Sequence, residues 1–193
     1  MALINKEFEQ IYKTHVAPRD VNGELWNYLV KSDFFVAPAS ARFHLKYAGG
    51  LAEHSVNVYK RLKKLLALDQ VTQYGEDSIA IVALLHDLCK ANYYKLSKRN
   101  VKENGMWKEV DYYTVEERLP YGHGEKSVFI IMNYVKLSKD EALAINWHMG
   151  GWDSRVKGGD YSISDAYRQC PLAVYLHLAD IQATYIDENH GEE

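Results

Sequence analysis

Apolar residues recur three and four positions apart along most of the chain, a period typical of helices with one buried face. Leu51, Val58 and Leu62 lie at such a spacing in one long segment, and Pro171 suits the first turn of a later helix. We therefore expect helices over residues 3–15, 21–30, 51–68, 79–90, 123–135, 139–148 and 171–187.

The period changes in the middle of the chain. Residues 94–102 and 107–116 are rich in aromatic and β-branched side chains, and the turn between them contains Asn104 and Gly105. This pattern predicts a β-hairpin, which we place as an insertion over residues 92–117. The segment 149–162 holds four glycines and is expected to be a mobile or tightly turned loop. The predicted fold class is mostly α, a helical bundle with an inserted β-hairpin.

No repeat, low-complexity tract or linker divides the chain, so we expect a single domain over residues 1–193. Within it, residues 1–48 are expected to form N-terminal helices and an approach loop. Residues 49–187 are expected to form the helical core.

The composition is that of an ordinary globular protein, with 47% hydrophobic and 25% charged residues and a net charge of -3. The missing basic excess disfavours a protein that binds mainly along a nucleic-acid backbone, although a small anionic substrate remains compatible. No apolar run approaches the roughly 20 residues that span a bilayer, and the N-terminus lacks a signal-peptide pattern. The two cysteines form no CxxC motif. These features predict a cytoplasmic protein with reduced thiols and no membrane partner.

Two acidic residues stand in segments that should be buried. Asp87 lies within IVALLHDL (81–88), and Asp180 lies within LAVYLHLADIQA (172–183). A buried, unpaired carboxylate costs several kcal/mol. Lys90 is the only basic residue near either of them in sequence, so the pattern favours a bound cation.

Four histidines accompany these acids. His86 shares the inward face of its predicted helix, and His54, His123 and His148 lie near the ends of theirs. A single histidine on such a face is usually a hydrogen-bonded core residue. Four of them together with two buried carboxylates are a suitable ligand set for a first-row metal ion.

The same residues carry a resemblance to a known family. The strings GGLAEHSVNV (49–58), LLHDLCK (84–90), YGHGEKSV (121–128), NWHMGGWD (146–153) and LHLAD (176–180) resemble the HD-domain superfamily of metal-dependent phosphohydrolases. GGLAEHS and HDLCK are also similar to the HD module of certain bacterial exoribonucleases. These 193 residues leave no room for the separate nucleic-acid-binding domain of those enzymes.

The resemblance implies a metal centre of one or two divalent ions (Mn, Fe, Co, Ni, Zn or Mg). One ion would be held by His54, His86, Asp87 and Asp180, and a second by His123 and His148 with Asp87 as a bridge. Relatives with two metals often have a second histidine where this chain has Met149, and a thioether is a poor ligand for such an ion.

The resemblance also implies a reaction, the hydrolysis of a phosphate ester by attack of metal-bound hydroxide. A nucleotide is the expected substrate. Asp87 and Lys90 are the expected catalytic residues, and Lys90 would stabilise charge in the transition state. The alternative for Lys90 is a helix C-terminal lysine that complements the helix dipole.

Several residues are candidates for substrate binding, each with a structural alternative. Loop and helix residues that could contact phosphate or base are Arg42, His44, Lys46, Lys126 and Arg155. An ordinary solvated loop is the favoured alternative for Arg42, His44 and Lys46, and plain exposure is the alternative for Lys126. Arg155 lies on the glycine-rich loop, which could close over a ligand. Glu53 is a candidate for orienting His54, and His177 is expected to bond a helix carbonyl rather than to support the metal.

Other functions compete with nucleotide hydrolysis. The same ligand scaffold occurs in di-iron HD oxygenases of small molecules, against which Lys90 argues. A nuclease acting on short oligonucleotides and a catalytically idle binding module are further alternatives. The hairpin aromatics Tyr94, Tyr112 and Tyr113 either stack on a nucleobase or pack the hairpin onto the bundle.

Overall fold

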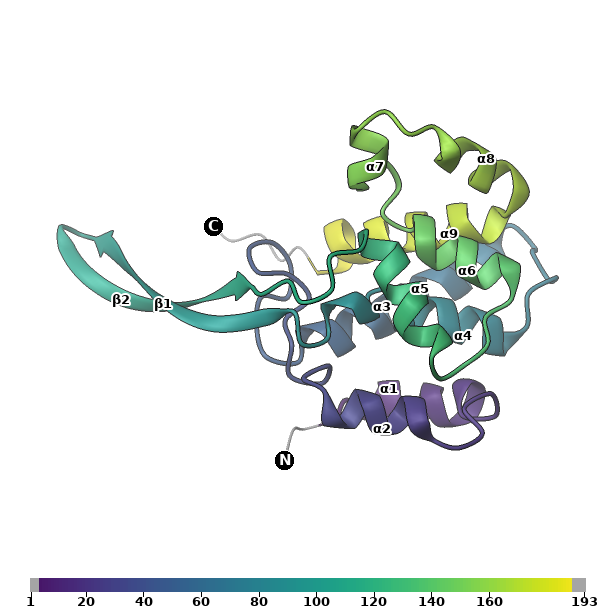
Figure 1. The fold of residues 1–193 in the computed structure, drawn as a ribbon, viewed down its shortest axis with the longest axis horizontal. Coiled ribbons are helices and arrows are strands. Elements are labelled where there is room, and N and C mark those ends of the chain that lie inside the picture. Colours follow the sequence, from purple (N-terminus) through teal and green to yellow (C-terminus); the bar gives the residue numbers. More distant parts are fainter. Residues whose placement is uncertain (1–3, 189–193) are drawn as a thin grey trace.

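The computed structural model describes residues 4–188, a mostly helical fold from which one hairpin projects (Figure 1). The predicted first helical residue, Leu3, and the outermost ends of the predicted domain lie outside these residues. The helices are α1 (Lys6–Ile11), α2 (Glu24–Lys31), α3 (Gly50–Leu68), α4 (Glu76–Leu85), α5 (His123–Met132), α6 (Lys139–Trp147), α7 (Ser154–Lys157), α8 (Ser162–Gln169) and α9 (Pro171–Gln182). Short 3-10 turns (Leu88–Lys90, Gly150–Trp152) and π-helical turns (Tyr12–Val16, Ala183–Asp187) extend several of them.

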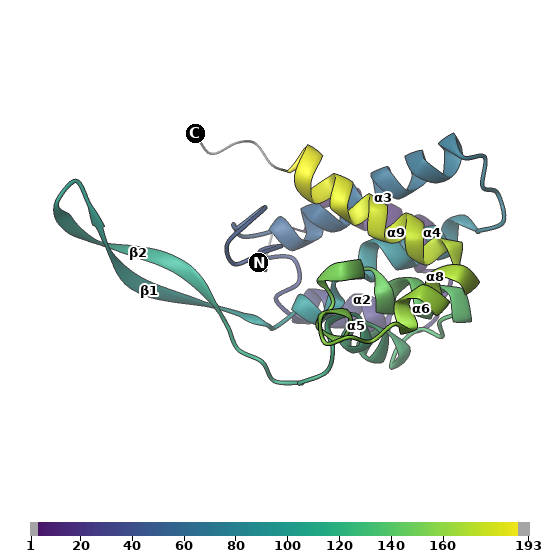
Figure 2. The ribbon, with the colours of Figure 1, turned by 90° about the horizontal axis from the view of Figure 1, so that it is seen from above.

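The helical body is built around α3, α4, α6 and α9. Helix α3 packs against both α4 and α9, while α6 packs against α9 and α5. Their buried faces and those of α1 and α2 form one apolar cluster, which includes Phe8, Leu51, Leu85 and Leu176. The four central helices therefore bring segments that are far apart in sequence to one place, and Figures 1 and 2 show them side by side.

The predicted hairpin is confirmed. Strands β1 (Tyr94–Glu103) and β2 (Met106–Val115) are antiparallel, with Tyr94 opposite Val115 at one end and Glu103 opposite Met106 at the other. Both turn residues have positive φ, 49° at Asn104 and 84° at Gly105, as an Asn-Gly hairpin turn requires. The hairpin projects away from the helices in both views rather than packing along them (Figures 1 and 2).

Helix boundaries differ from the sequence expectations at several ends. The predicted helix over 79–90 stops at Leu85, and a 3-10 turn replaces its last part. The predicted glycine-rich loop over 149–162 contains a 3-10 turn and α7, and α8 was not predicted at all. Helix α8 (SISDAYRQ) has only eight residues and buries only Ala166, although Ile163, Ala166 and Tyr167 stand at helical spacing.

No helix within residues 4–188 combines the length and the apolar character needed to cross a membrane.

Candidate metal centre

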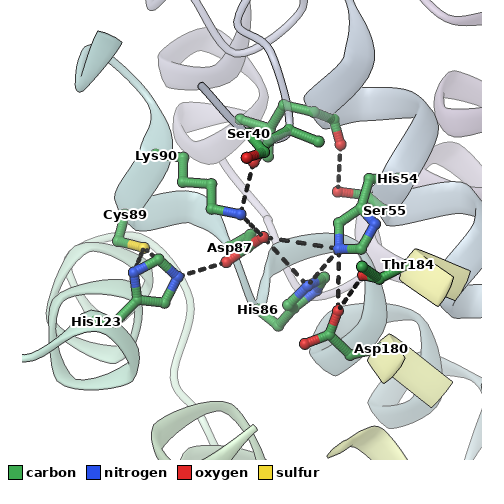
Figure 3. Close-up of polar contacts among 12 residues, drawn as sticks. Ser40, His54, Ser55, His86, Asp87, Cys89, Lys90, His123, Asp180 and Thr184 are labelled. Carbon is green, nitrogen blue, oxygen red and sulfur yellow. Dashed lines mark hydrogen bonds and ion pairs between the residues drawn. The ribbon is translucent and has the colours of Figure 1, made fainter. Parts of the chain in front are cut away.

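Three distant segments converge on one point, where His54, His86, Asp87 and Asp180 point toward one another (Figure 3). His54 comes from the first turns of α3, His86 and Asp87 directly follow α4, and Asp180 comes from α9. His54 Nε2 lies 3.2 Å from Asp180 Oδ1, 3.3 Å from His86 Nε2 and 3.7 Å from Asp87 Oδ2. Four atoms that can bind a metal therefore face a common space.

A second group meets on the other side of Asp87. His123 Nε2 lies 2.7 Å from Asp87 Oδ1, and His148 Nε2 lies 3.5 Å from the same oxygen. The two oxygens of Asp87 thus face different histidines. Oδ1 faces His123 and His148, whereas Oδ2 faces His54 and His86, and His86 Nε2 lies 3.5 Å from it. The Asp87 carboxylate therefore lies between two groups of histidines.

A glycine lets the second group form. A Cβ built on Gly124 would lie 2.2 Å from the carbonyl oxygen of Asn146 and 2.6 Å from that of Ile145. Backbone atoms cannot give way as a flexible side chain can, so any larger residue would push α5 from the last turn of α6. Gly124 directly follows His123, and Asn146 lies two residues before His148, so this close approach brings the two histidines together.

The hydrogen bonds of the buried histidines test whether the site suits a cation. His86 Nδ1 bonds the Ala83 carbonyl at 2.8 Å, and His148 Nδ1 bonds the Ile145 carbonyl at 2.7 Å. A carbonyl only accepts, so Nδ1 carries the proton in both rings, and Nε2 of each neutral ring presents its lone pair to the cluster. His148 Nε2 is buried and has no hydrogen-bond partner among residues 4–188.

Two imidazole lone pairs, the buried Asp87 carboxylate and the partly exposed Asp180 carboxylate face one space, and together they attract a cation. Nitrogen and oxygen donors of this kind suit first-row divalent ions. Groups of three possible ligands whose atoms lie within 4.8 Å of one another include His54, His86 and Asp87; His86, His148 and Asp180; and Asp87, His123 and His148. The donor set therefore fits a divalent metal ion.

The surroundings push the pKa values of the histidines apart. Burial, reinforced by neighbouring histidines, lowers the pKa of His86 to about 4, although Asp87 and Asp180 oppose this. Burial also works against the charged form of His54, but its bonds to Asp180 and Glu188 outweigh this and raise its pKa to about 10. A metal ion that bound here would meet one imidazole that is already neutral and would have to displace a proton from the other.

Asp87, which is buried, and Asp180, whose side chain is 18% exposed, both stay ionised. Burial raises the pKa of Asp87, but Lys90 and the surrounding histidines hold it well below its ordinary value. Burial likewise opposes the lowered pKa of Asp180, which the bond to His54 produces. Both carboxylates are therefore negatively charged at neutral pH and able to bind a cation.

Lys90 belongs to the site. Its ammonium group donates to Asp87 Oδ2 at 2.6 Å and to the Ala39 carbonyl at 2.7 Å (Figure 3). Burial would lower its pKa, but the Asp87 carboxylate raises it, so Lys90 is charged at neutral pH. Its contacts are those of a buried ion pair beside the cluster rather than of a lysine at a solvated helix end.

His44 is the one predicted substrate-binding residue that lies against the cluster. Its ring centroid is 4.9 Å from that of His54, and its two buried ring nitrogens make no hydrogen bond to any described residue, although Nε2 lies 3.7 Å from Glu188 Oε2. Burial, with the charge of His54, lowers its pKa to about 4. Arg42 and Lys46, on the same loop, are exposed.

The two remaining predicted substrate residues are already paired with carboxylates. Lys126 is 5% exposed and bonds Glu117, so plain exposure, the expected alternative for this lysine, is wrong. Arg155 bonds Asp153 at 2.7 Å and Glu125 at 2.8 Å, which ties the segment after α6 to α5.

Glu188 and Cys89 also belong to the site, although the sequence did not single them out. Both Glu188 oxygens lie 3.0 Å from His54 Nδ1, and Cys89 Sγ lies 3.4 Å from His123 Nε2. The residue proposed to orient His54, Glu53, instead accepts a bond from Tyr47.

His177 behaves as expected. Its Nδ1 bonds the backbone carbonyl of His148 at 2.6 Å, at the end of α6.

Comparisons with known proteins reveal one partial similarity. No family model matches the chain. No solved structure matches it either. Over 84 residues the chain is 37% identical to the dihydroneopterin 2',3'-cyclic phosphate phosphodiesterase of Methanocaldococcus jannaschii. The match covers 42% of this chain and 31% of that relative. Part of this chain is thus similar to an enzyme that hydrolyses a phosphate ester, and the structure has His and Asp groups that could hold a metal ion.

Proposed function

We propose that this protein is an HD-type, metal-dependent phosphohydrolase that cleaves a phosphate ester of a nucleotide. One observation carries the proposal: the Nε2 lone pairs of His86 and His148 face the same space as two carboxylates, one buried and one partly exposed. The similarity to a phosphodiesterase supports the type of bond. In this proposal residues 1–193 form a single HD-type domain with residues 49–187 as its core.

The proposed ligand sets follow the two sides of Asp87. His54, His86, Asp87 and Asp180 would hold one ion. His123 and His148 would hold a second, with Asp87 shared. Support comes from the distances around Asp87, whose two oxygens face different histidines. His148 also groups with His86 and Asp180, so it lies within reach of either position.

A bound divalent ion would lower the pKa of a coordinated water and offset charge on the phosphate oxygens. The protein supplies the rest of the chemistry. The Lys90 ammonium, held by Asp87 and the Ala39 carbonyl, donates to a non-bridging phosphate oxygen and stabilises the charge that develops there. His44, whose ring nitrogens make no hydrogen bond within residues 4–188 and whose Nε2 lies 3.7 Å from Glu188 Oε2, contacts the same phosphate. Arg42 and Lys46 remain proposed contacts at the exposed edge.

The substrate class is proposed from the chemistry of the bond. The relative's name specifies a cyclic phosphodiester, and we infer that this chain also acts on a phosphate ester carried by a small molecule. A nucleotide combines such an ester with a base. Aromatic residues at the start of the hairpin near Lys90, such as Tyr94, are candidates to contact that base. The proposed partner is thus a small phosphorylated substrate.

The test is a screen of metals against substrates. Mn, Fe, Co, Ni, Zn and Mg are combined with cyclic and linear nucleotides, nucleoside triphosphates and short oligonucleotides, and the released phosphate, pyrophosphate or nucleotide is measured. We expect hydrolysis that a chelator abolishes and that His86→Ala and Asp180→Asn reduce at least 100-fold. His15→Ala, which alters a histidine outside the cluster, should leave it unchanged.

Full activity in either cluster variant would refute the assignment of the site. Oxygen uptake by the iron-loaded protein without phosphate-ester cleavage would identify a di-iron oxygenase instead. Cleavage restricted to oligonucleotides would identify a nuclease.

A further inference from the structure

The end of α9 changes its helical geometry in a way that affects the site. Residues Ala183–Asp187 form a π-helical turn, closed by a 3.0 Å bond from the Glu188 amide to the Ala183 carbonyl. At the 100° per residue of an α-helix, Glu188 would lie about 80° around the axis from Asp180. The wider π turn rotates less per residue and moves Glu188 back toward the face that carries Asp180.

This turn delivers a buried carboxylate to His54. Glu188 is 6% exposed, and both of its carboxylate oxygens lie 3.0 Å from His54 Nδ1. Asn57, one helical turn beyond His54 on α3, donates its side-chain amide to Glu188 Oε1 at 2.9 Å. Asp180 and Glu188 therefore bracket the imidazole, one at each ring nitrogen.

His54 is held differently from the other buried histidines. The Nδ1 atoms of His86 and His148 bond backbone carbonyls, which are neutral acceptors. His54 alone among these three bonds a carboxylate at Nδ1. A carboxylate partner holds the proton on Nδ1, directs the Nε2 lone pair to the metal and makes the ring a stronger ligand.

We propose that Glu188 is a positioning residue that orients His54 and strengthens it as a metal ligand, and that the π turn exists to place it there. The inference rests on the proposed function, since it takes His54 as a ligand. Glu188 itself touches neither the ion nor the substrate. A group that hydrogen-bonds the second ring nitrogen of a metal-binding histidine typically contributes about 10- to 100-fold to metal affinity.

The test compares Glu188→Ala and Glu188→Gln with Asp187→Asn. Asp187 is the matched control because it is the neighbouring acid and pairs with Arg61 instead of His54. Circular dichroism of the chelator-treated proteins establishes that each variant is folded. Isothermal titration calorimetry with Mn2+ then measures affinity and the number of ions bound per chain.

We expect Glu188→Ala to weaken Mn2+ binding about 10- to 100-fold at unchanged stoichiometry. Glu188→Gln, whose amide oxygen still accepts from Nδ1 but carries no charge, should lie between Glu188→Ala and the wild type. Asp187→Asn should match the wild type. The Co2+-loaded Glu188→Ala protein should also show a shifted d–d absorption band, a change that a purely structural role would not produce.

Three results would overturn the inference. Folded Glu188 variants that bind Mn2+ within twofold of the wild type would show that His54 needs no such partner. Loss of one ion per chain at unchanged affinity would make Glu188 a ligand, together with His44 and His54. A wild-type protein that binds no Mn2+ would refute the proposed function itself, whereas the first two results are compatible with that function.

Discussion

Substituting Asp87 by alanine should destabilise the metal-free protein far more than substituting its partner Lys90. The two side chains form an ion pair at 2.6 Å, with 3% of the Asp87 side chain and 13% of the Lys90 side chain exposed. Asp87→Ala leaves the buried ammonium with only the Ala39 carbonyl, 2.7 Å away. Lys90→Met leaves Asp87 its bond to His123, 2.7 Å away.

The magnitude follows from the burial of the pair. Removing one partner of a buried ion pair costs about 3–5 kcal/mol, because the other charge stays out of water without compensation. A domain of this size has a free energy of unfolding of about 5–15 kcal/mol, so the loss is a large fraction of the total. For Lys90→Met we expect about 1–2 kcal/mol, the cost of one lost charge-assisted bond.

The assay is urea unfolding of chelator-treated protein, followed by circular dichroism. The double variant Asp87→Ala, Lys90→Met should be more stable than Asp87→Ala alone, because it no longer buries an unpaired ammonium. An Asp87→Ala protein within about 0.5 kcal/mol of the wild type would refute this reasoning. So would a double variant that is less stable than Asp87→Ala.

Three further predictions concern pH, the hairpin and the metal. Burial raises the pKa of Glu141, but bonds from Arg19, Ser78 and the Ser138 amide lower it below its ordinary value. The ionised Glu141 therefore contributes its full stabilisation above about pH 4.3, and this contribution is lost as the pH falls through the lower native pKa. In Glu141→Gln the free energy of unfolding should therefore depend less steeply on pH below about 4.3 than in the wild type. Replacing residues 98–111 by a short Asn-Gly turn should change the urea-derived free energy of unfolding by less than about 1 kcal/mol, because this part of the hairpin projects from the helices. Mn2+ at about 100 times its dissociation constant should raise the free energy of unfolding by about 2.7 kcal/mol in the same assay, and a chelator should reverse this increase. An unchanged free energy of unfolding would mean that the folded state binds no ion.

The regular elements could be predicted because they depend on local patterns. The Asn104 and Gly105 turn and the β-branched segments around it were enough to predict the hairpin, with strand ends within one residue. The long helix α3 was likewise predicted to within one residue. Helix α8 was missed although Ile163, Ala166 and Tyr167 stand at helical spacing, because it is short and directly follows the glycine-rich segment that was expected to be a loop.

The candidate site could be predicted only in part. Acids such as Asp87 and Asp180 in apolar segments stand out because burying an unpaired charge is costly. Glu188 does not stand out, since its place beside His54 depends on a π turn that shifts the helical register. Lys126 and Arg155 could not be assigned from sequence because their pairing with carboxylates depends on tertiary contacts.

Six side chains from distant segments are proposed to surround bound cations, and anomalous diffraction can locate such ions. Crystals grown with Mn2+ should show a peak within ligand distance of His54, His86, Asp87 and Asp180. A second peak, if that site fills, should lie on the opposite side of Asp87, beside His123 and His148. Binding of Mn2+ only elsewhere on the surface, with this cluster empty at saturating metal, would contradict the account.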